Sequence, residues 1–354
     1  MIPLPIRGRA ASGNPPNRFV GIEVRPDPEA DPGEDPRPRT RFLEDASRSV
    51  ISFNDSPDVG FDASVNPYRG CEVGCIYCYA RTFHEYLGFS AGLDYETRIL
   101  VKRRAPHLLR EALASPRWRP QVVAMSGATD PYQPVERRLR ITRGCLEVLA
   151  EARNPVCIIT KRDLVVRDVD LLSGLAGVGA ASVRLSVTTL DPALQRSMEP
   201  RGSTAARRIE AMRRLAAAGV PVGVNVAPVI PGLNDHEIPA ILETAREAGA
   251  SSATFILLRL PHGVATLFEE WLDRCWPDRR AKVMERIRDT RGGRLYDARF
   301  RVRGRGEGEY AGQIRALFST TASRLGLDRR PPELSSAAFT RPRAGPQLGL
   351  FDTP

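Results

Sequence analysis

Short apolar runs rich in β-branched residues alternate with amphipathic segments along the middle of this chain. Runs typical of buried strands occupy residues 122–125, 156–160, 183–187, 220–226 and 254–258. Helical periodicity is found between and after them, over roughly 135–152, 168–175, 204–218, 235–248 and 264–290. Strand–helix repeats of about 30 residues predict right-handed βαβ units, and such units build a parallel sheet.

A further strand, expected at residues 61–65, completes six βα units. A full eight-unit barrel needs more chain, so an open partial barrel and a doubly wound sheet are the two candidate folds. The loops that follow the strands are polar and contain Gly and Pro. Because the carboxyl ends of parallel strands lie at one edge of a sheet, we expect the functional site at that edge.

The two ends of the chain differ from the repeat region in composition. Residues 1–48 and 328–354 are rich in Pro, Arg and Gly and poor in large apolar side chains, which predicts disordered extensions. The expected organisation is therefore a disordered N-terminal segment at 1–48, a barrel at 49–290, an extension packed on the barrel at 291–327 and a flexible tail at 328–354.

The charge balance is strongly basic. The 52 Lys and Arg residues exceed the 42 Asp and Glu residues by 10, which favours a polyanionic partner such as nucleic acid. An arginine-rich composition can equally reflect a high-GC genome, so charge alone does not decide the matter. No apolar run approaches the roughly 20 residues that a membrane span needs, and no signal peptide is recognisable, so we expect a cytoplasmic protein with reduced thiols.

Three of the six cysteines lie within eight residues. Cys71, Cys75 and Cys78 have the spacing C-x3-C-x2-C, which is tight enough for three thiolates to converge on one inorganic centre. A four-iron cluster bound by three thiolates keeps one iron open for another ligand. A zinc site completed by His84 is the alternative, although packing or hydrogen bonding is the simpler role for this histidine. A structural disulfide is disfavoured in the cytosol.

Several stretches around these cysteines are similar to one enzyme superfamily. The sequence CEVGCIYC resembles the cysteine signature of the radical S-adenosylmethionine (SAM) superfamily. More narrowly, NPYRGCEVGCIYCYAR, TDPYQPVE, TKRDLVVRD, EPR at 199–201 and APVIPGLND resemble an uncharacterised bacterial branch related to spore photoproduct lyase, described as DNA repair photolyase-like. The resemblance covers most of residues 49–318 and implies a partial (β/α)6 barrel.

The resemblance also implies a chemistry. A 4Fe-4S cluster held by Cys71, Cys75 and Cys78 would bind SAM at its open iron and, once reduced by a donor such as flavodoxin or ferredoxin, generate a 5′-deoxyadenosyl radical. The implied reaction is lyase-like repair or modification of DNA. A radical SAM enzyme acting on RNA, protein or a small molecule is the main alternative, and a metal-binding nucleic-acid module without turnover is the third. The resemblance assigns no catalytic residue.

Candidate SAM-binding residues follow the strands. Tyr77 stands where the superfamily commonly places an aromatic residue near the adenine, although plain packing is its alternative role. Ser126, Thr129 and Asp130 offer oxygen atoms to the SAM ammonium group or ribose, although Asp-Pro is also a common turn pair.

Further candidates follow the third, fourth and fifth strands of the repeat. Lys161, Ser186 and Arg201 are candidates to bind the SAM carboxylate through charge-assisted hydrogen bonds. Asn225, with the PVIPG turn, resembles the segment that borders the nucleoside.

The other three cysteines do not match a known role. Photoproduct lyases use an additional cysteine as a hydrogen-atom donor. Cys145 and Cys157 lie in apolar surroundings and read as small buried hydrophobic residues, and Cys275 reads as structural too. No hydrogen donor is therefore identified.

Two further motifs bear on partners. The segment 291–310, RGGRLYDARFRVRGRGEGEY, alternates Arg with apolar residues and is predicted to be a strand with an arginine face. That face would follow a phosphate backbone with Tyr296 or Phe300 for base stacking, or would simply protect a solvated sheet edge.

The motif QLGLF at 347–351 resembles the peptide by which bacterial replication and repair proteins bind the DNA polymerase sliding clamp. Its Gln347, Leu348, Leu350 and Phe351 would fill a groove on the clamp or dock on the protein's own barrel.

Overall fold

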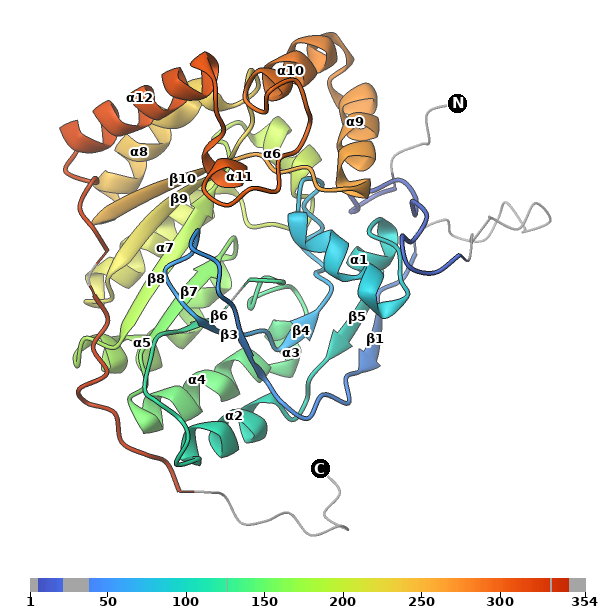
Figure 1. Ribbon diagram of the computed structural model, residues 1–354. Helices are drawn as coiled ribbons and strands as arrows, with labels where there is room; N and C mark the ends of the chain where they lie inside the picture. The colour runs from blue at the N-terminus through green and yellow to red at the C-terminus, as the bar shows by residue number, and fades with distance from the viewer. Residues whose placement is uncertain (1–5, 22–37, 126, 332, 344–354) are drawn as a thin grey trace.

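The centre of the molecule is a curved, mostly parallel sheet (Figure 1). The computed structural model describes residues 6–21, 38–125, 127–331 and 333–343. The seven strands of the sheet have the order β10-β9-β8-β7-β6-β3-β2. Their bounds are β2 Ile51–Phe53, β3 Ala63–Val65, β6 Val123–Met125, β7 Val156–Thr160, β8 Ala181–Val187, β9 Val222–Val229 and β10 Ser252–Leu257. The strands from β3 to β10 pair in parallel, and β2 is an antiparallel edge strand.

Helices cover the outer face of the sheet. They are α2 Ala105–Ala114, α3 Glu136–Leu139, α4 Ile141–Ala152, α5 Val169–Ala176, α7 Ala205–Ala217, α8 Ile238–Glu247 and α12 Glu309–Arg324 (Figure 1). The strands and these helices share one core of buried Val, Ile and Leu side chains. The sheet does not close, because β10 and β2 are its two edges. The expected partial (β/α)6 barrel is confirmed, with β3, β6, β7, β8, β9 and β10 as its strands.

Two predicted helices are each divided in two. The helix expected over 264–290 is α9 Gly263–Cys275 followed by α10 Pro277–Asp289, because Pro277 lacks a backbone N–H and starts a new helix. The helix expected over 135–152 is α3 and α4, which meet at Arg140 in a left-handed conformation with φ of 54°. A hydrophobic pattern continues across such breaks and cannot reveal them.

The cysteine loop, residues 70–78, begins where one strand of a second, small sheet ends. This sheet has the order β1-β5-β4, with β1 Arg41–Glu44, β4 Tyr68–Arg69 and β5 Arg98–Val101. Three short helical segments, η1 Tyr79–Phe83, η2 Glu85–Leu87 and α1 Leu93–Thr97, lie between β4 and β5. In the repeat that follows, η3 Asp163–Asp168 precedes α5, α6 Pro192–Met198 follows β8, and η4 Asp235–Glu237 precedes α8.

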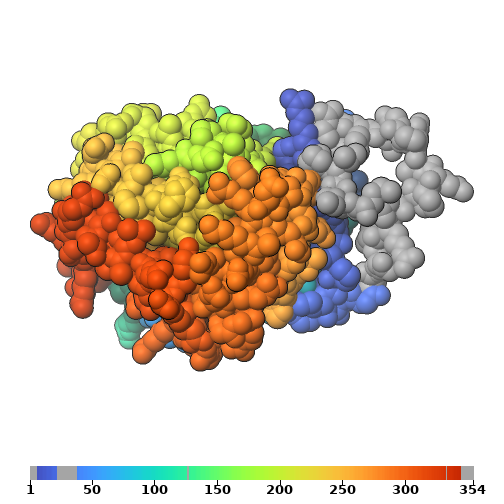
Figure 2. Space-filling view, turned by 90° about the horizontal axis from the view of Figure 1, so that it is seen from above, coloured from blue at the N-terminus to red at the C-terminus, as the bar shows by residue number. Residues whose placement is uncertain are grey.

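Part of the N-terminal region is packed, unlike the expectation of disorder over 1–48. Residues 6–21 and 38–48 are described, and Ala10 and Ala11 are buried. The backbone N–H groups of both alanines donate to the carboxylate of Glu96, at 3.3 and 3.0 Å. Figure 2 shows the dark blue N-terminal segment beside the orange α9. Hydrogen bonds to a distant carboxylate order this segment, and composition cannot reveal them.

The C-terminal tail is likewise placed up to residue 343. Ser335 N donates to Gly179 O and Thr340 N to Ala152 O, both at 2.9 Å, and Arg341 donates to Leu113 O at 3.1 Å. These acceptors lie where α5, α4 and α2 end, at the edge of the sheet where its strands begin. Residues 347–351, which carry the QLGLF motif, lie outside the described residues. The domain boundaries predicted at 48, 290 and 327 stay predictions.

The arginine-rich segment 291–310 is not a strand, so that prediction is wrong. Its regular element is the short helix α11 Val302–Arg305, and Arg301 has a φ of 67°. A strand requires negative φ at every residue, so this backbone cannot place the arginines on one strand face. No helix in the described part of the chain is both long enough and apolar enough to cross a membrane.

Candidate active site

The three clustered cysteines lie on a loop between β4 and η1. Cys71 N donates to Tyr95 O at 2.9 Å, and turns from Gly74 N to Cys71 O and from Cys78 N to Cys75 O fold the loop, each at 3.2 Å. Gly74 has a φ of 66°, and a Cβ there would lie 2.7 Å from Glu96 Oε2. Only glycine therefore suits this position.

A buried ion pair holds the cysteine loop in place. The Arg81 guanidinium contacts Glu96 Oε1 at 2.5 Å, and neither side chain is exposed. Arg81 also donates to the carbonyls of Gly74 and Cys75, at 3.0 and 2.9 Å. Its Nη1 donates to the carbonyls of Ala91 and Gly92, at 3.1 and 2.9 Å, so Arg81 ties the cysteine loop to the segment before α1. Sequence analysis did not identify either residue.

The three thiols are free and suit a metal cluster better than a single ion. Cys71 and Cys75 are buried and Cys78 is half-buried, with its Sγ 3.5 Å from the Tyr95 hydroxyl. Burial raises the pKa of the Cys71 and Cys75 thiols, and the charge of Asp130 adds to this at Cys71, so a cationic centre is needed to hold them as thiolates. Within the described ranges no three His, Cys, Asp or Glu side chains converge on one ion. A four-iron cluster does not need such convergence, because each thiolate binds a different iron.

His84, the alternative zinc ligand, packs among aromatic rings. Its ring centroid lies 5.1 Å from that of Phe89 and 5.6 Å from that of Tyr95. Burial lowers the pKa of His84 to about 4, so the imidazole is neutral at pH 7. These contacts favour the packing role expected from the sequence.

A network of polar side chains centred on Glu199 lies beside Cys75. Glu199 Oε1 accepts hydrogen bonds from Tyr77 and from Thr188, the latter at 2.6 Å, and lies 3.4 Å from Lys161 Nζ. Glu199 Oε2 binds the guanidinium of Arg208, and both side chains are buried. Burial alone would raise the pKa of Glu199, but the charges of Arg208 and Lys161 hold it well below its usual range. The carboxylate is therefore ionised in the interior.

The network brings together two of the predicted SAM-binding residues. Lys161 Nζ lies 5.4 Å from the ring centroid of Tyr77 and donates to Thr188 Oγ1 at 3.0 Å and Ala227 O at 2.8 Å. These residues come from the ends of β7, β8 and β9 and from the cysteine loop. The carboxyl ends of the strands thus bring a cation, a carboxylate and a phenol close to the thiols.

Two other predicted SAM-binding residues, Asp130 and Thr129, already have hydrogen-bond partners. Asp130 accepts from Thr160 Oγ1 at 2.7 Å and from Lys161 N at 2.8 Å. Thr129 is buried, and its hydroxyl lies 3.4 Å from Tyr68 O. Ser126 lies outside the described residues.

Two further predicted residues face each other in the sheet. Ser186 of β8 pairs with Asn225 of β9, and both are buried. Asn225 Oδ1 accepts from Thr254 Oγ1 at 2.6 Å. Whether these residues contact SAM stays a prediction.

Arg201 connects two loops at the rim. Its guanidinium lies 3.0 Å from Glu72 Oε1, and Glu72 Oε2 accepts from Val135 N at 2.8 Å. Glu72 is the residue between Cys71 and Val73, so this contact joins the cysteine loop to the loops after β6 and α6. Sequence analysis missed Glu72, Thr188, Glu199 and Arg208 as site residues. The one signal in the sequence was the EPR motif at 199–201. Its glutamate follows an apolar helix end, and a carboxylate in such a place needs a buried partner.

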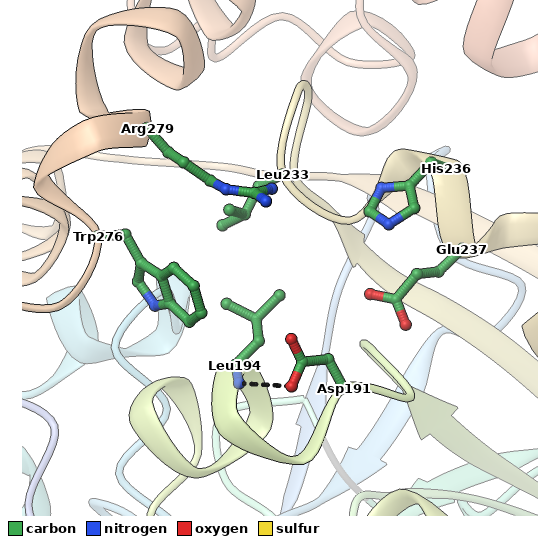
Figure 3. Close-up of a pocket in the computed structure, with 7 residues that line it drawn as sticks. All are labelled: Asp191, Leu194, Leu233, His236, Glu237, Trp276 and Arg279. Atoms are coloured by element: carbon green, nitrogen blue, oxygen red, sulfur yellow. Dashed lines mark hydrogen bonds between the residues drawn. The ribbon is translucent and has the colours of Figure 1, made fainter.

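A cavity of about 230 Å³ lies apart from the predicted site residues (Figure 3). It is lined by Asp191, Leu194, Leu233, His236, Glu237, Trp276 and Arg279. Its two carboxylates are already used: Asp191 accepts from the backbone of α6, and Glu237 accepts from Leu190 N at 2.6 Å. The cavity therefore adds no free acid to the site.

Comparison with known proteins finds one matching family model and several similar proteins. The sequence profile described as "Radical SAM superfamily" matches residues 65–245. The chain is 36% identical over 230 residues to an uncharacterized protein of Mycobacterium tuberculosis, covering 64% of this chain and 68% of that protein. It is 27% identical over 197 residues to the FeMo cofactor biosynthesis protein NifB of Klebsiella pneumoniae, covering 51% of this chain and 39% of that protein. Among solved structures, a mutant of spore photoproduct lyase has a similar fold, with a TM-score of 0.56 and 17% identity. The match covers 80% of this chain and 79% of that chain.

Proposed function

The chain belongs to the radical SAM superfamily, and on that premise we propose that it is a lyase-like enzyme acting on nucleic acid. Membership implies a 4Fe-4S cluster and SAM, which together supply a 5′-deoxyadenosyl radical when an electron arrives. The observation that carries the proposal is the meeting of three free thiols and the Glu199 network at the carboxyl edge of an open parallel sheet. We further propose that the enzyme works in the cytoplasm, where thiols stay reduced.

We assign the cluster to Cys71, Cys75 and Cys78. The donor set fits, because the three thiols are unbridged and lie on one loop whose backbone is fixed by Arg81. The role of this chain's residues is to hold three thiolates in a dry environment and to leave one iron free of protein ligands. The Tyr95 hydroxyl, which donates to Ala128 O at 3.1 Å, lies 3.5 Å from Cys78 Sγ and is part of the surroundings of this sulfur.

We assign SAM to the neighbouring polar network. Lys161 would bind the SAM carboxylate through a charge-assisted hydrogen bond, and Tyr77 would pack against the nucleoside. Glu199 would keep Lys161 and Tyr77 in position, since it contacts both. Thr129, Asp130, Ser186, Arg201 and Asn225 stay candidates for the remaining polar contacts.

Nucleic acid is the proposed substrate class on two grounds. The chain carries a net charge of +10, which attracts a polyanion. In addition, a mutant of spore photoproduct lyase with dinucleoside spore photoproduct has a similar fold over 80% of this chain, with a TM-score of 0.55. A base in a duplex would have to be unpaired or flipped out to reach the barrel.

The substrate assignment is tested by 5′-deoxyadenosine release. We expect the reconstituted, dithionite-reduced enzyme to release it slowly without substrate and several-fold faster with the right nucleic acid. DNA with and without ultraviolet lesions, RNA of the same sequence, and heparin as a non-nucleic polyanion should be compared by chromatography. Equal release with heparin and with every nucleic acid would contradict a nucleic-acid substrate.

A second partner is proposed for the tail. We propose that Gln347, Leu348, Leu350 and Phe351 bind the bacterial sliding clamp, because a short apolar motif after a Pro- and Arg-rich stretch is a typical groove-binding peptide. A peptide of residues 340–354 should bind purified clamp with micromolar affinity, and the same peptide with Leu350→Ala and Phe351→Ala should bind at least tenfold more weakly. Fluorescence anisotropy measures both. If the native peptide and its alanine version bind alike, the motif has another role.

A further inference from the structure

Arginine and aromatic side chains form a partly exposed surface beside the cysteine loop, outside the proposed cofactor site. We define the arginine–aromatic surface as Tyr79, Arg259, Phe300, Arg301 and Arg303. Tyr79 directly follows Cys78, and its hydroxyl donates to Gly127 O at 2.8 Å. The Arg259 guanidinium carbon lies 4.5 Å from the Tyr79 ring centroid. The surface thus begins at the residue next to a proposed cluster ligand.

The rest of the surface comes from the segment wrongly predicted to be a strand. The Arg303 guanidinium carbon lies 4.4 Å from the Phe300 ring centroid, and Arg303 forms an ion pair with Asp58. Arg301 N donates to Asp58 Oδ1 at 2.6 Å. Burial raises the pKa of Asp58, but its bonds to Arg301 and Arg303 and the charges of Arg303 and Arg259 lower it overall.

The surface extends across the open side of the sheet. Asp58 lies in the loop between β2 and β3, at one edge. Arg303 belongs to α11, which packs beside β10 at the other edge. In Figure 1 the blue loop after β2 rises toward the orange α11. A ligand on this surface therefore lies at the gap between the two sheet edges and next to the cysteine loop.

The surface carries unbalanced positive charge. The Arg259 and Arg301 guanidinium groups have no acidic partner within the described part of the chain, and Asp58 is already paired with Arg303. The other acids of the segment, Asp297 and Glu307, bind Arg299. The aromatic rings are accessible to a stacking ligand, since Phe300 is 50% exposed and Tyr79 is 37% exposed.

We propose that the arginine–aromatic surface binds single-stranded nucleic acid and presents an unpaired base to the opening of the barrel. This inference rests on the proposed nucleic-acid function and names the form of the substrate. Guanidinium groups attract phosphates of any sequence, and exposed rings stack only on bases that are not already paired. Exposed rings placed between arginines suit a single strand, whose bases can stack on the rings, better than a duplex, whose bases are already paired.

The test is binding by the anaerobically purified full chain. The probe is a fluorescein-labelled single strand of about 12 nucleotides, within the usual footprint of such surfaces, and a duplex of the same sequence. The test variant combines Phe300→Ala with Arg301→Gln. The matched control combines Leu317→Ala with Arg246→Gln, an exposed apolar residue on α12 and an exposed arginine on α8.

We expect the test variant to bind the single strand about tenfold more weakly, because a stacking ring and a phosphate contact are lost together. The slope of log affinity against log salt should fall by about one, since one phosphate contact is removed. The control should match the native chain in both readings. If the double variant unfolds by circular dichroism, Arg301→Glu alone replaces it, because that side chain is exposed.

Other outcomes overturn the inference in distinguishable ways. If the native chain binds the strand and the test variant binds it equally well, this surface is not the binding site, while the nucleic-acid function stands. If duplex binds more tightly than the single strand, the single-strand assignment is wrong. If no nucleic acid binds and none stimulates 5′-deoxyadenosine release, both proposals fail, and an acidic protein becomes the expected occupant.

Discussion

Changing Cys75 to alanine should remove the iron-sulfur cluster and lower SAM cleavage by more than about a hundredfold, because two thiolates cannot hold a cube that needs three. The native chain, reconstituted without oxygen, should contain about four irons and absorb near 400 nm. The variant should be colourless or nearly so. Iron analysis and 5′-deoxyadenosine release after dithionite reduction measure the two effects.

The chain supplies its own matched control for this experiment. Cys275 is a free, half-buried thiol at the end of α9, outside the cysteine loop. Cys275→Ala should keep the iron content and the cleavage rate of the native protein. Equal loss of iron from both variants would mean that the spacing at 71, 75 and 78 does not define the cluster site. A colourless native protein that binds zinc would remove the radical chemistry altogether.

Changing Glu199 to glutamine should cost about 3–5 kcal/mol of unfolding free energy, which is typical of leaving one member of a buried ion pair alone. Arg208 is 1% exposed in its side chain and would lose the carboxylate that it binds. Its other bonds, to the carbonyls of Ser203 and Ser186 at 2.8 Å each, do not neutralise the charge. The shift of the urea midpoint at pH 7, with an unchanged slope, measures this effect.

Glu210→Gln is the matched control for that variant. The ion pair of Glu210 with Arg213 is about half exposed on both sides, so its removal should change stability by less than about 1 kcal/mol. A loss at Glu210 as large as that at Glu199 would show that burial does not decide the effect.

The same carboxylate should make stability depend on pH. Because the pKa of Glu199 is lower in the folded chain than in the unfolded chain, its contribution is complete above the unfolded value of about 4.3 and falls as the pH drops below it. The native chain should therefore lose more stability between pH 6 and pH 3 than Glu199→Gln does. Denaturation series at several pH values measure the difference.

The strands of the parallel sheet were largely readable from the sequence, and the buried polar contacts were not. The strand at Val156–Thr160 was predicted to the residue, because its apolar run is bounded by Pro155 on one side and Lys161 on the other. The helices broken at Arg140 and Trp276 were predicted as single, since amphipathic spacing continues through each break. Glu199 and Arg208 gave no periodic signal, because their pairing depends on α6 and α7 meeting in space.

The segment around Arg301 illustrates the limit of alternation patterns. Arg, Phe, Arg, Val and Arg in sequence fit a strand, yet a positive φ at Arg301 and the bonds to Asp58 turn the backbone instead. Those bonds join residues more than 240 positions apart in the chain, at 243 and 245. No local pattern contains them. Whether the arginines and aromatic rings of this segment bind a nucleic acid stays a prediction.

The placement of the C-terminal tail has a geometric consequence. Through Ser335, Thr340 and Arg341 the chain is fastened where the strands begin, whereas the thiols lie where the strands end. A partner attached beyond residue 343 would thus approach from the rear of the barrel and leave its mouth unobstructed. If the tail binds a clamp as proposed, the clamp and the reactant would approach opposite sides of the barrel.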